Sequence, residues 1–227
     1  MSGRQILASI QVAKPFIFLC CFTIGDLHLK TPTAIFIGAT ILSIAAASAG
    51  PLEDARTAEG RHDYATALRI IRPLAERGDA AAQYELGELY YSGLGVPQVG
   101  AEAVKWYRRA ALQGHPAAQH MLALSYEYGT GVARNMAESL KWLRRAAEQG
   151  YAYSQYRLGQ MYESPGRFGV TLAQDLIEAH KWYNLSAAGG DPAGERARTE
   201  LETKMTPAQI DEAQRRAGAW KPKQLER

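Results

Sequence analysis

Apolar residues recur at steps of three and four positions along the middle of the chain, which is the spacing of one face of an α-helix. The first clear stripe comprises Ala82, Leu86, Leu89 and Tyr90. A second stripe follows it: Ala103, Trp106, Tyr107, Ala110 and Ala111. The glycine- and proline-containing stretch 93–97 lies between them and predicts a turn. The pattern therefore predicts two helices joined by a short turn.

The same pattern is repeated along the chain. Residues 79–114 and 115–150 are two copies of 36 residues, and 151–190 is a third copy of 40 with extra residues around 164–168. Trp106, Trp142 and Trp182 mark the same position in each copy. No helix of such a unit can bury its apolar face alone, so neighbouring units must stack. The sequence thus predicts an all-α fold, an α/α solenoid of helix-turn-helix repeats.

The flanks of the repeats are expected to cap the stack. Residues 50–78 predict an N-terminal capping helix pair, and 191–220 predict C-terminal capping helices. Within the latter, Thr206 suits an N-cap, Pro207 the first helical position and Gln209 the reciprocal position of a capping box. Trp220 is expected to fold back on the last pair, and 221–227 to form a flexible tail.

The repeated motif AxxQYxLGxxYxxGxGVxxxxxEAxKWYxxAAxxG is similar to that of the Sel-1-like repeat family, relatives of the tetratricopeptide repeats. The residues that carry the resemblance in the first copy are Ala82, Leu86, Gly87, Tyr90, Gly93, Gly95, Val96, Ala103, Trp106, Ala110, Ala111 and Gly114. Two features depart from it: Ala123 replaces the first-helix glycine in the second copy, and the loop of the third copy is rebuilt. The resemblance implies a TPR-like solenoid that mediates protein–protein interaction, often in exported or signalling bacterial proteins.

The first 49 residues have the composition of a leader. Residues 33–49 are apolar and uncharged, Lys30 stands before them, and Ala47-Ser48-Ala49 closes the run. This order is typical of a bacterial signal peptide, so we expect cleavage near Ala49 and a periplasmic or secreted chain. The alternative is an uncleaved inner-membrane anchor. A translation start near Leu29 would give a simpler leader.

Charge and cysteine content narrow the range of functions. The chain of 227 residues carries 26 basic and 23 acidic residues, a formal net charge of +3, which is too balanced for a dedicated nucleic-acid binder. Both cysteines, Cys20 and Cys21, lie in the leader. A disulfide scaffold and a cysteine-based zinc site are therefore excluded for the remainder.

The sequence predicts no catalytic, metal or cofactor site. It contains neither a zinc-protease helix motif, nor a nucleophile elbow, nor a phosphate-binding loop in the strand-to-helix context that such a loop needs. His115 and His120 would point about 140° apart on a helix, so they would not chelate one metal. We therefore expect a protein that is not an enzyme.

A binding surface follows from the predicted architecture, since the first helices of stacked pairs line the concave side of a solenoid. With the Leu-Gly-x-x-Tyr frame turned towards the partner helix, one set of positions remains facing the groove. We call this set the first-helix strip: Tyr84, Glu88, Tyr91, His120, Leu124, Glu127, Tyr128, Tyr153, Tyr156, Gln160 and Glu163. Tyrosines are favoured in binding hot spots, although some could serve only to pack the repeats.

The predicted partner is another protein or a peptide. Two alternatives remain open at the level of sequence. One is a periplasmic enzyme or small-ligand sensor that uses an inter-repeat pocket. The other is a membrane-anchored structural accessory of an envelope complex, which requires that the leader is retained.

Overall fold

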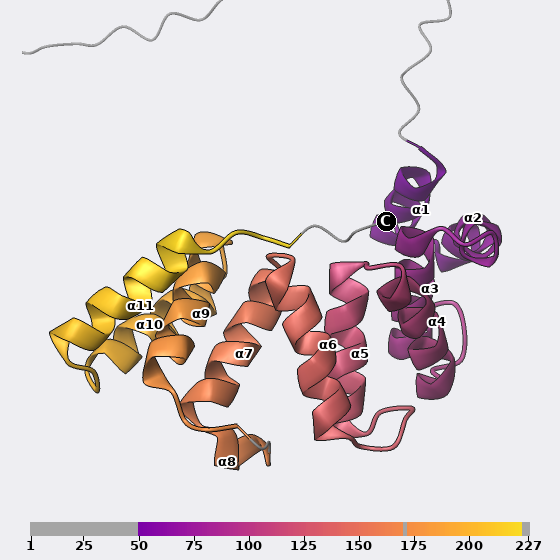
Figure 1. The fold of residues 1–227 in the computed structure, drawn as a ribbon. Coiled ribbons are helices and arrows are strands. Elements are labelled where there is room, and N and C mark those ends of the chain that lie inside the picture. Colours follow the sequence, from indigo (N-terminus) through magenta and orange to yellow (C-terminus); the bar gives the residue numbers. More distant parts are fainter. Residues whose placement is uncertain (1–49, 170–171, 224–227) are drawn as a thin grey trace, which may run out of the picture. The chain divides into compact units, whose positions relative to one another are not determined.

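The computed structural model describes residues 50–169 and 172–223, and these fold into α-helices with no strand (Figure 1). Predictions for the leader, residues 1–49, lie outside the described residues. The first six helices are α1 (Pro51–Gly60), α2 (Tyr64–Glu76), α3 (Ala80–Ser92), α4 (Gly100–Leu112), α5 (Pro116–Tyr128) and α6 (Met136–Glu148). The others are α7 (Ala152–Glu163), α8 (Pro165–Phe168), α9 (Leu176–Ala188), α10 (Pro192–Glu202) and α11 (Pro207–Ala219).

Helices that follow one another in the chain pack in pairs. The pairs α1–α2, α3–α4, α5–α6 and α7–α9 each pack internally, and the second helix of one pair contacts the first helix of the next. Helices α10 and α11 both pack on α9. The prediction of an all-α stack of helix-turn-helix units is confirmed. The short helix α8 interrupts the third pair and was not predicted.

Local sequence explains where the helices begin and end. Aspartate or asparagine side chains cap several helices, as when the Asp79 carboxylate accepts a hydrogen bond of 2.8 Å from the Ala82 amide. The Thr206–Gln209 capping box is present at the start of α11. Gly114 has φ +91°, the left-handed conformation that ends a helix without the steric penalty of a side chain. The glycines and capping residues identified in the sequence therefore lie where the backbone needs them, at the ends of the helices.

Packing within a pair depends on a match between one small residue and one large residue. A Cβ on Gly87 would lie 2.6 Å from the ring of Tyr107, and a Cβ on Gly159 would lie 2.6 Å from the ring of Tyr183. The second copy has Ala123 in place of the glycine and Leu143 in place of the tyrosine, both fully buried. The departure at Ala123 is thus compensated within its own helix pair, because a smaller partner leaves room for the methyl group.

A glycine packed against a tyrosine ring and a glycine in open space should respond in opposite ways to replacement by alanine. Gly87→Ala should lower the free energy of unfolding by about 1–2 kcal/mol, because the cost of overpacking exceeds the gain in helix propensity. Gly218→Ala, at a helical site with no neighbouring atom within 4 Å, should raise it by about 0.5–1 kcal/mol. Urea unfolding measures both changes. Equal effects at the two sites would contradict the packing argument.

Buried glutamines connect each repeat to the one before it. Gln119 Nε2 donates to the Ala111 carbonyl at 3.1 Å, and Gln149 Nε2 donates to Gln119 Oε1 at 2.7 Å. Gln83 and Gln155 make the same bond to the preceding second helix. These bonds satisfy polar groups that the close approach of the helices removes from water, so they fix the spacing between repeats.

The C-terminal segment lies against earlier helices. Trp220 packs on Trp182 with ring centroids 6.4 Å apart and an interplanar angle of 72°. The Lys223 amide then donates to the Glu148 carbonyl at 2.7 Å. In the part of the chain that the structure describes, no helix is long and apolar enough to cross a membrane.

Candidate functional site

The first-helix strip falls into two structurally different groups. Near the N-terminal ends of α3, α5 and α7 it makes aromatic contacts between neighbouring repeats, which we call the aromatic cluster. Near the C-terminal ends of α5 and α7 it lines cavities beside α8. The residues that the structure places in the aromatic cluster are Tyr84, His120 and Tyr153. Those that line the cavities are Glu127, Tyr128, Tyr156, Gln160 and Glu163. Glu88, Tyr91 and Leu124 belong to neither group.

The aromatic cluster joins the first repeat to the second and the second repeat to the third. Tyr84 stacks on His115 at 5.0 Å between ring centroids. His120 contacts the rings of Tyr151 and Tyr153 at 5.4 and 6.4 Å. Tyr84 and His120 are only partly accessible, so much of their surface serves to pack the repeats. Tyr153 is 58% exposed and remains available for a partner.

His120 is held neutral at physiological pH. Burial, assisted by the positive charge of Arg157, lowers the pKa of His120 from 6.5 to about 4. His120 Nδ1 lies 2.8 Å from the Ser154 hydroxyl, a contact between α5 and α7. The neutral imidazole is therefore part of the joint between the second and third repeats.

This pKa predicts a specific loss of stability in acid. Between pH 6.5 and 4 the unfolded chain binds a proton at this histidine that the folded chain does not, so stability falls as the pH falls through that window. The contribution is about 3 kcal/mol across the window. The difference in unfolding free energy between the wild type and His120→Gln should therefore shrink from pH 7 to pH 4. If the unfolding free energies of the two chains changed in parallel with pH, this explanation would be contradicted. Burial also lowers the pKa of His115, but His115 is present in both chains and does not affect the difference between them.

Glu88 is occupied within its own helix pair. Its carboxylate accepts a hydrogen bond of 2.6 Å from the Tyr107 hydroxyl. Burial raises the pKa of Glu88 above its ordinary value, and the Tyr107 bond acts in the opposite direction. In the second copy the corresponding positions are Leu124 and Leu143, an apolar pair. Glu88 therefore contributes to packing and Leu124 is half-buried, whereas Tyr91 is 41% exposed.

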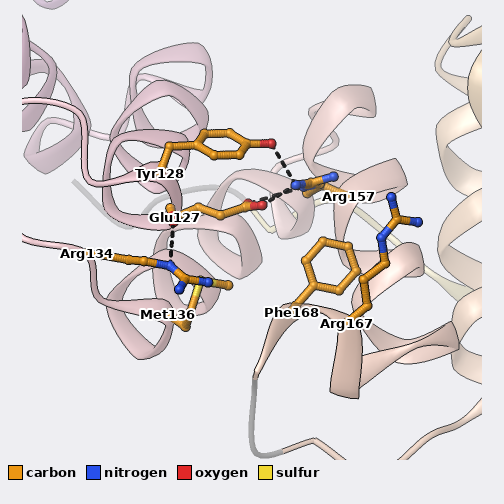
Figure 2. A pocket seen from close by; sticks show the side chains of 7 residues that line it. All are labelled: Glu127, Tyr128, Arg134, Met136, Arg157, Arg167 and Phe168. Carbon is orange, nitrogen blue, oxygen red and sulfur yellow. Dashed lines mark hydrogen bonds and ion pairs between the residues drawn. The ribbon is translucent and has the colours of Figure 1, made fainter.

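A cavity of about 530 Å³ lies between α5 and the inserted helix α8 (Figure 2). We call it the arginine pocket. Its lining residues are Glu127, Tyr128, Arg134, Met136, Arg157, Arg167 and Phe168. Arg134 and Met136 stand on one side of it, and Phe168 and Arg167 on the other. A volume of this size falls in the range of small-molecule and peptide side-chain sites.

An ion pair between α5 and α7 forms the back of the arginine pocket. The Arg157 guanidinium pairs with the Glu127 carboxylate, which is only 6% exposed, and its Nε donates to that carboxylate at 3.2 Å. It also donates to the Tyr128 hydroxyl at 2.9 Å and to Gln160 Oε1 at 2.9 Å. Arg157 is thus held by three partners, and its guanidinium lies 4.8 Å from the centre of the Phe168 ring.

A smaller cavity of about 210 Å³ lies on the other side of α8 and shares Arg167 and Phe168 with the arginine pocket. Three residues of the first-helix strip line it: Tyr156, Gln160 and Glu163. Glu163 is engaged there, since it accepts from the Tyr183 hydroxyl at 2.8 Å and pairs with Lys204 at 3.0 Å. The inserted helix therefore divides the first-helix surface into two hollows of different character.

The comparisons with known proteins agree with the repeat architecture. The family model described as Sel1 repeat matches three consecutive segments, residues 80–115, 116–151 and 152–191. The chain belongs to the Sel1 repeat family. Sel1 repeats form a helical scaffold that is generally used in protein interactions.

Two solved structures are similar to this Sel1 repeat chain. A Sel1 repeat protein from Oxalobacter formigenes has a TM-score of 0.59 and 33% identity over 65% of this chain and 59% of that one. A protective antigen present in uropathogenic Escherichia coli strains, which displays an SLR fold, has a TM-score of 0.51 and 24% identity. That likeness covers 74% of this chain and 44% of the antigen, and it concerns the fold alone. The chain thus spans less than two thirds of either protein, and no curated protein matches it.

Among the residues that the structure describes, no group of three or more His, Cys, Asp or Glu side chains is placed so that it could hold a metal ion. The Gly93 and Gly95 segment is an inter-helix turn, with φ of +72° and +71°. His115 caps α5 while His120 faces α7, so the two histidines are engaged separately.

Sequence reasoning missed five residues of the arginine pocket: Arg134, Met136, Arg157, Arg167 and Phe168. The signal that could have found the last two is the insertion near 164–168, the one place where the third Sel1 repeat departs in length from the others. Such an insertion maps to a loop, and loops between repeats are where binding residues gather. Arg157 could not be singled out, since pairing with Glu127 requires knowledge of how neighbouring first helices align.

Proposed function

We propose that this Sel1 repeat chain is an exported scaffold that binds another protein or a peptide through the surface of its first helices. The observation that carries the proposal is the location of its exposed tyrosines. Among the described residues, the tyrosines that are exposed are Tyr91, Tyr128 and Tyr153, and they lie on α3, α5 and α7. Exposed tyrosines provide large contact area at a low cost in conformational entropy.

The second helices present a different surface, which supports this assignment. On α4 and α6 a lysine pairs with a glutamate three residues earlier, Lys105 with Glu102 and Lys141 with Glu138, both at 3.2 Å. Arg109 and Arg145 lie over the rings of Trp106 and Trp142 at 4.5 and 4.7 Å. Exposed lysines that already pair with glutamates of the same helix are typical of a solvated face.

The sequence of the leader supports an extracytoplasmic location. A basic residue, an apolar run and a small-residue terminus are the three parts of a secretory signal, and cleavage near Ala49 would release the repeats into the periplasm or medium. An inner-membrane anchor is the alternative outcome, and the mass of the mature chain distinguishes the two.

Affinity capture from an envelope fraction tests the binding function. The full chain serves as bait beside Tyr128→Ala/Tyr153→Ala, and Leu112→Ala is the matched control because Leu112 is a 69% exposed apolar side chain on α4, a second helix. Each tyrosine at a hot spot should contribute about 2 kcal/mol, so the double variant should lose its partner. Equal capture by all three folded baits would contradict the proposal.

The arginine pocket favours one second candidate, a sensor of a small ligand, because its volume of about 530 Å³ fits such a molecule. Its one carboxylate, that of Glu127, is committed to Arg157, so the pocket offers recognition rather than acid–base chemistry. A ligand that raises the melting temperature without any partner protein would favour this candidate.

A further inference from the structure

We propose that the arginine pocket binds an acidic side chain of the partner, attracted by the positive charge of Arg134 and Arg167 on its two sides. This inference rests on the proposed function, which it deepens by naming the chemistry of the bound segment. It begins with the charges that line the pocket, three guanidinium groups and a single carboxylate.

The one carboxylate cannot neutralise all three arginines. Glu127 is buried and is bound through both of its oxygens by Arg157. Arg134 interacts with the same residue, but through the backbone: its Nε donates to the Glu127 carbonyl at 3.0 Å. That bond orients the Arg134 side chain and leaves its positive charge uncompensated. The Glu127–Arg157 ion pair therefore has a structural role in the pocket, and Arg134 and Arg167 give the pocket its excess positive charge.

Arg167 is the cation contributed by the insertion. It follows Gly166 in α8, is exposed, and lies 5.9 Å from the ring centre of Phe168. Phe168 is buried and packs into the core with α5 and α6 residues such as Leu122 and Leu143, which anchors the short helix. The carboxylates on the far side of α8 are Glu163, which already pairs with Lys204, and Glu200, which lines the smaller cavity.

The chemistry of the remaining lining residues suits a peptide side chain. Arginine presents a planar fork of donors that matches a carboxylate, and it is weakly hydrated enough to bind one in a partly enclosed site. Met136 and Phe168 offer apolar surface to the methylene groups of a glutamate or to a neighbouring apolar residue. Exposed Tyr128 stands at the same pocket, so the pocket is continuous with the surface proposed to bind the partner.

Calorimetric titration of the full chain with two capped peptides tests the proposal. The probes are Glu-Leu-Glu-Leu-Glu and its uncharged counterpart Gln-Leu-Gln-Leu-Gln, each acetylated and amidated. The glutamate peptide should bind at least tenfold more tightly at low salt, and the preference should decrease at high salt as the charges are screened. Arg134→Gln/Arg167→Gln should abolish the preference.

The chain contains a matched control for the loss of two positive charges. Arg69 and Arg72 line another hollow, of about 360 Å³, beside α2, and Arg69→Gln/Arg72→Gln should keep the preference. Arg167→Gln alone, at an exposed residue of α8, should reduce the preference and guards against misfolding of the double variant. The proposal would be overturned if the Arg69/Arg72 variant lost the preference for the glutamate peptide to a comparable extent. It would also be overturned if the wild type showed no preference, or if free glutamate bound as tightly as the peptide. Partner capture that still depends on Tyr128 and Tyr153 would then leave the proposed function standing.

Discussion

Arg157→Met is expected to lower the free energy of unfolding by about 3 kcal/mol, because it leaves the Glu127 carboxylate buried without a cation. Glu127 lies on α5 and Arg157 on α7, so the pair joins the second and third repeats. Methionine retains much of the volume of the arginine stem over Phe168, which restricts the effect to the charge and its hydrogen bonds. Chemical denaturation measures the loss.

A double variant separates this ion pair from side-chain packing. Glu127→Gln/Arg157→Met removes both charges, and it should be less destabilised than Arg157→Met by at least about 1 kcal/mol, since no buried charge remains unpaired. A double variant as unstable as the sum of the two single variants would show that the two side chains do not interact.

Gly131→Ala is expected to destabilise the fold by about 3 kcal/mol for two reasons that add. Its φ of +71° is strained for alanine. Its added Cβ would also lie 2.2 Å from the backbone carbonyl of Gly100, the first residue of α4, so the loop of the second repeat could no longer approach the first.

Gly129→Ala is the matched control for this change. Gly129 has nearly the same φ, +75°, but the atom nearest to its added Cβ would be at 3.5 Å, an ordinary contact. It should therefore cost only about 1 kcal/mol, the part that comes from backbone strain. Equal losses at the two glycines would show that the close approach of the loops does not limit stability.

The fold was predictable because the sequence signals that specify it are local and occur in several copies. The Trp106, Trp142 and Trp182 positions set the length of each unit, and the glycines between helices mark turns that need positive φ. The Thr206 capping box located the last helix. Each of these signals depends on residues near one another in sequence, and three copies of the same pattern support one interpretation.

The site was only partly predictable, since it depends on alignments between helices. The strip on the first helices placed Glu127 and Tyr128 at the arginine pocket, but the sequence does not tell that Glu127 is neutralised by Arg157, 30 positions away. Nor does periodicity distinguish Tyr84, which stacks on His115, from Tyr153, which remains exposed. The inserted α8 broke the repeat pattern, and with it the basis for assigning the faces of Arg167 and Phe168.

The central claim is that the first helices form the binding surface, and photo-crosslinking tests it most directly. A photoreactive p-benzoylphenylalanine would replace Tyr128, Tyr153 or, on the opposite helix layer, Leu112 in the full chain produced in its native host. Residues 128 and 153 should give one common adduct with a partner protein, and residue 112 should give none. An adduct formed from residue 112 and absent from residues 128 and 153 would contradict the account.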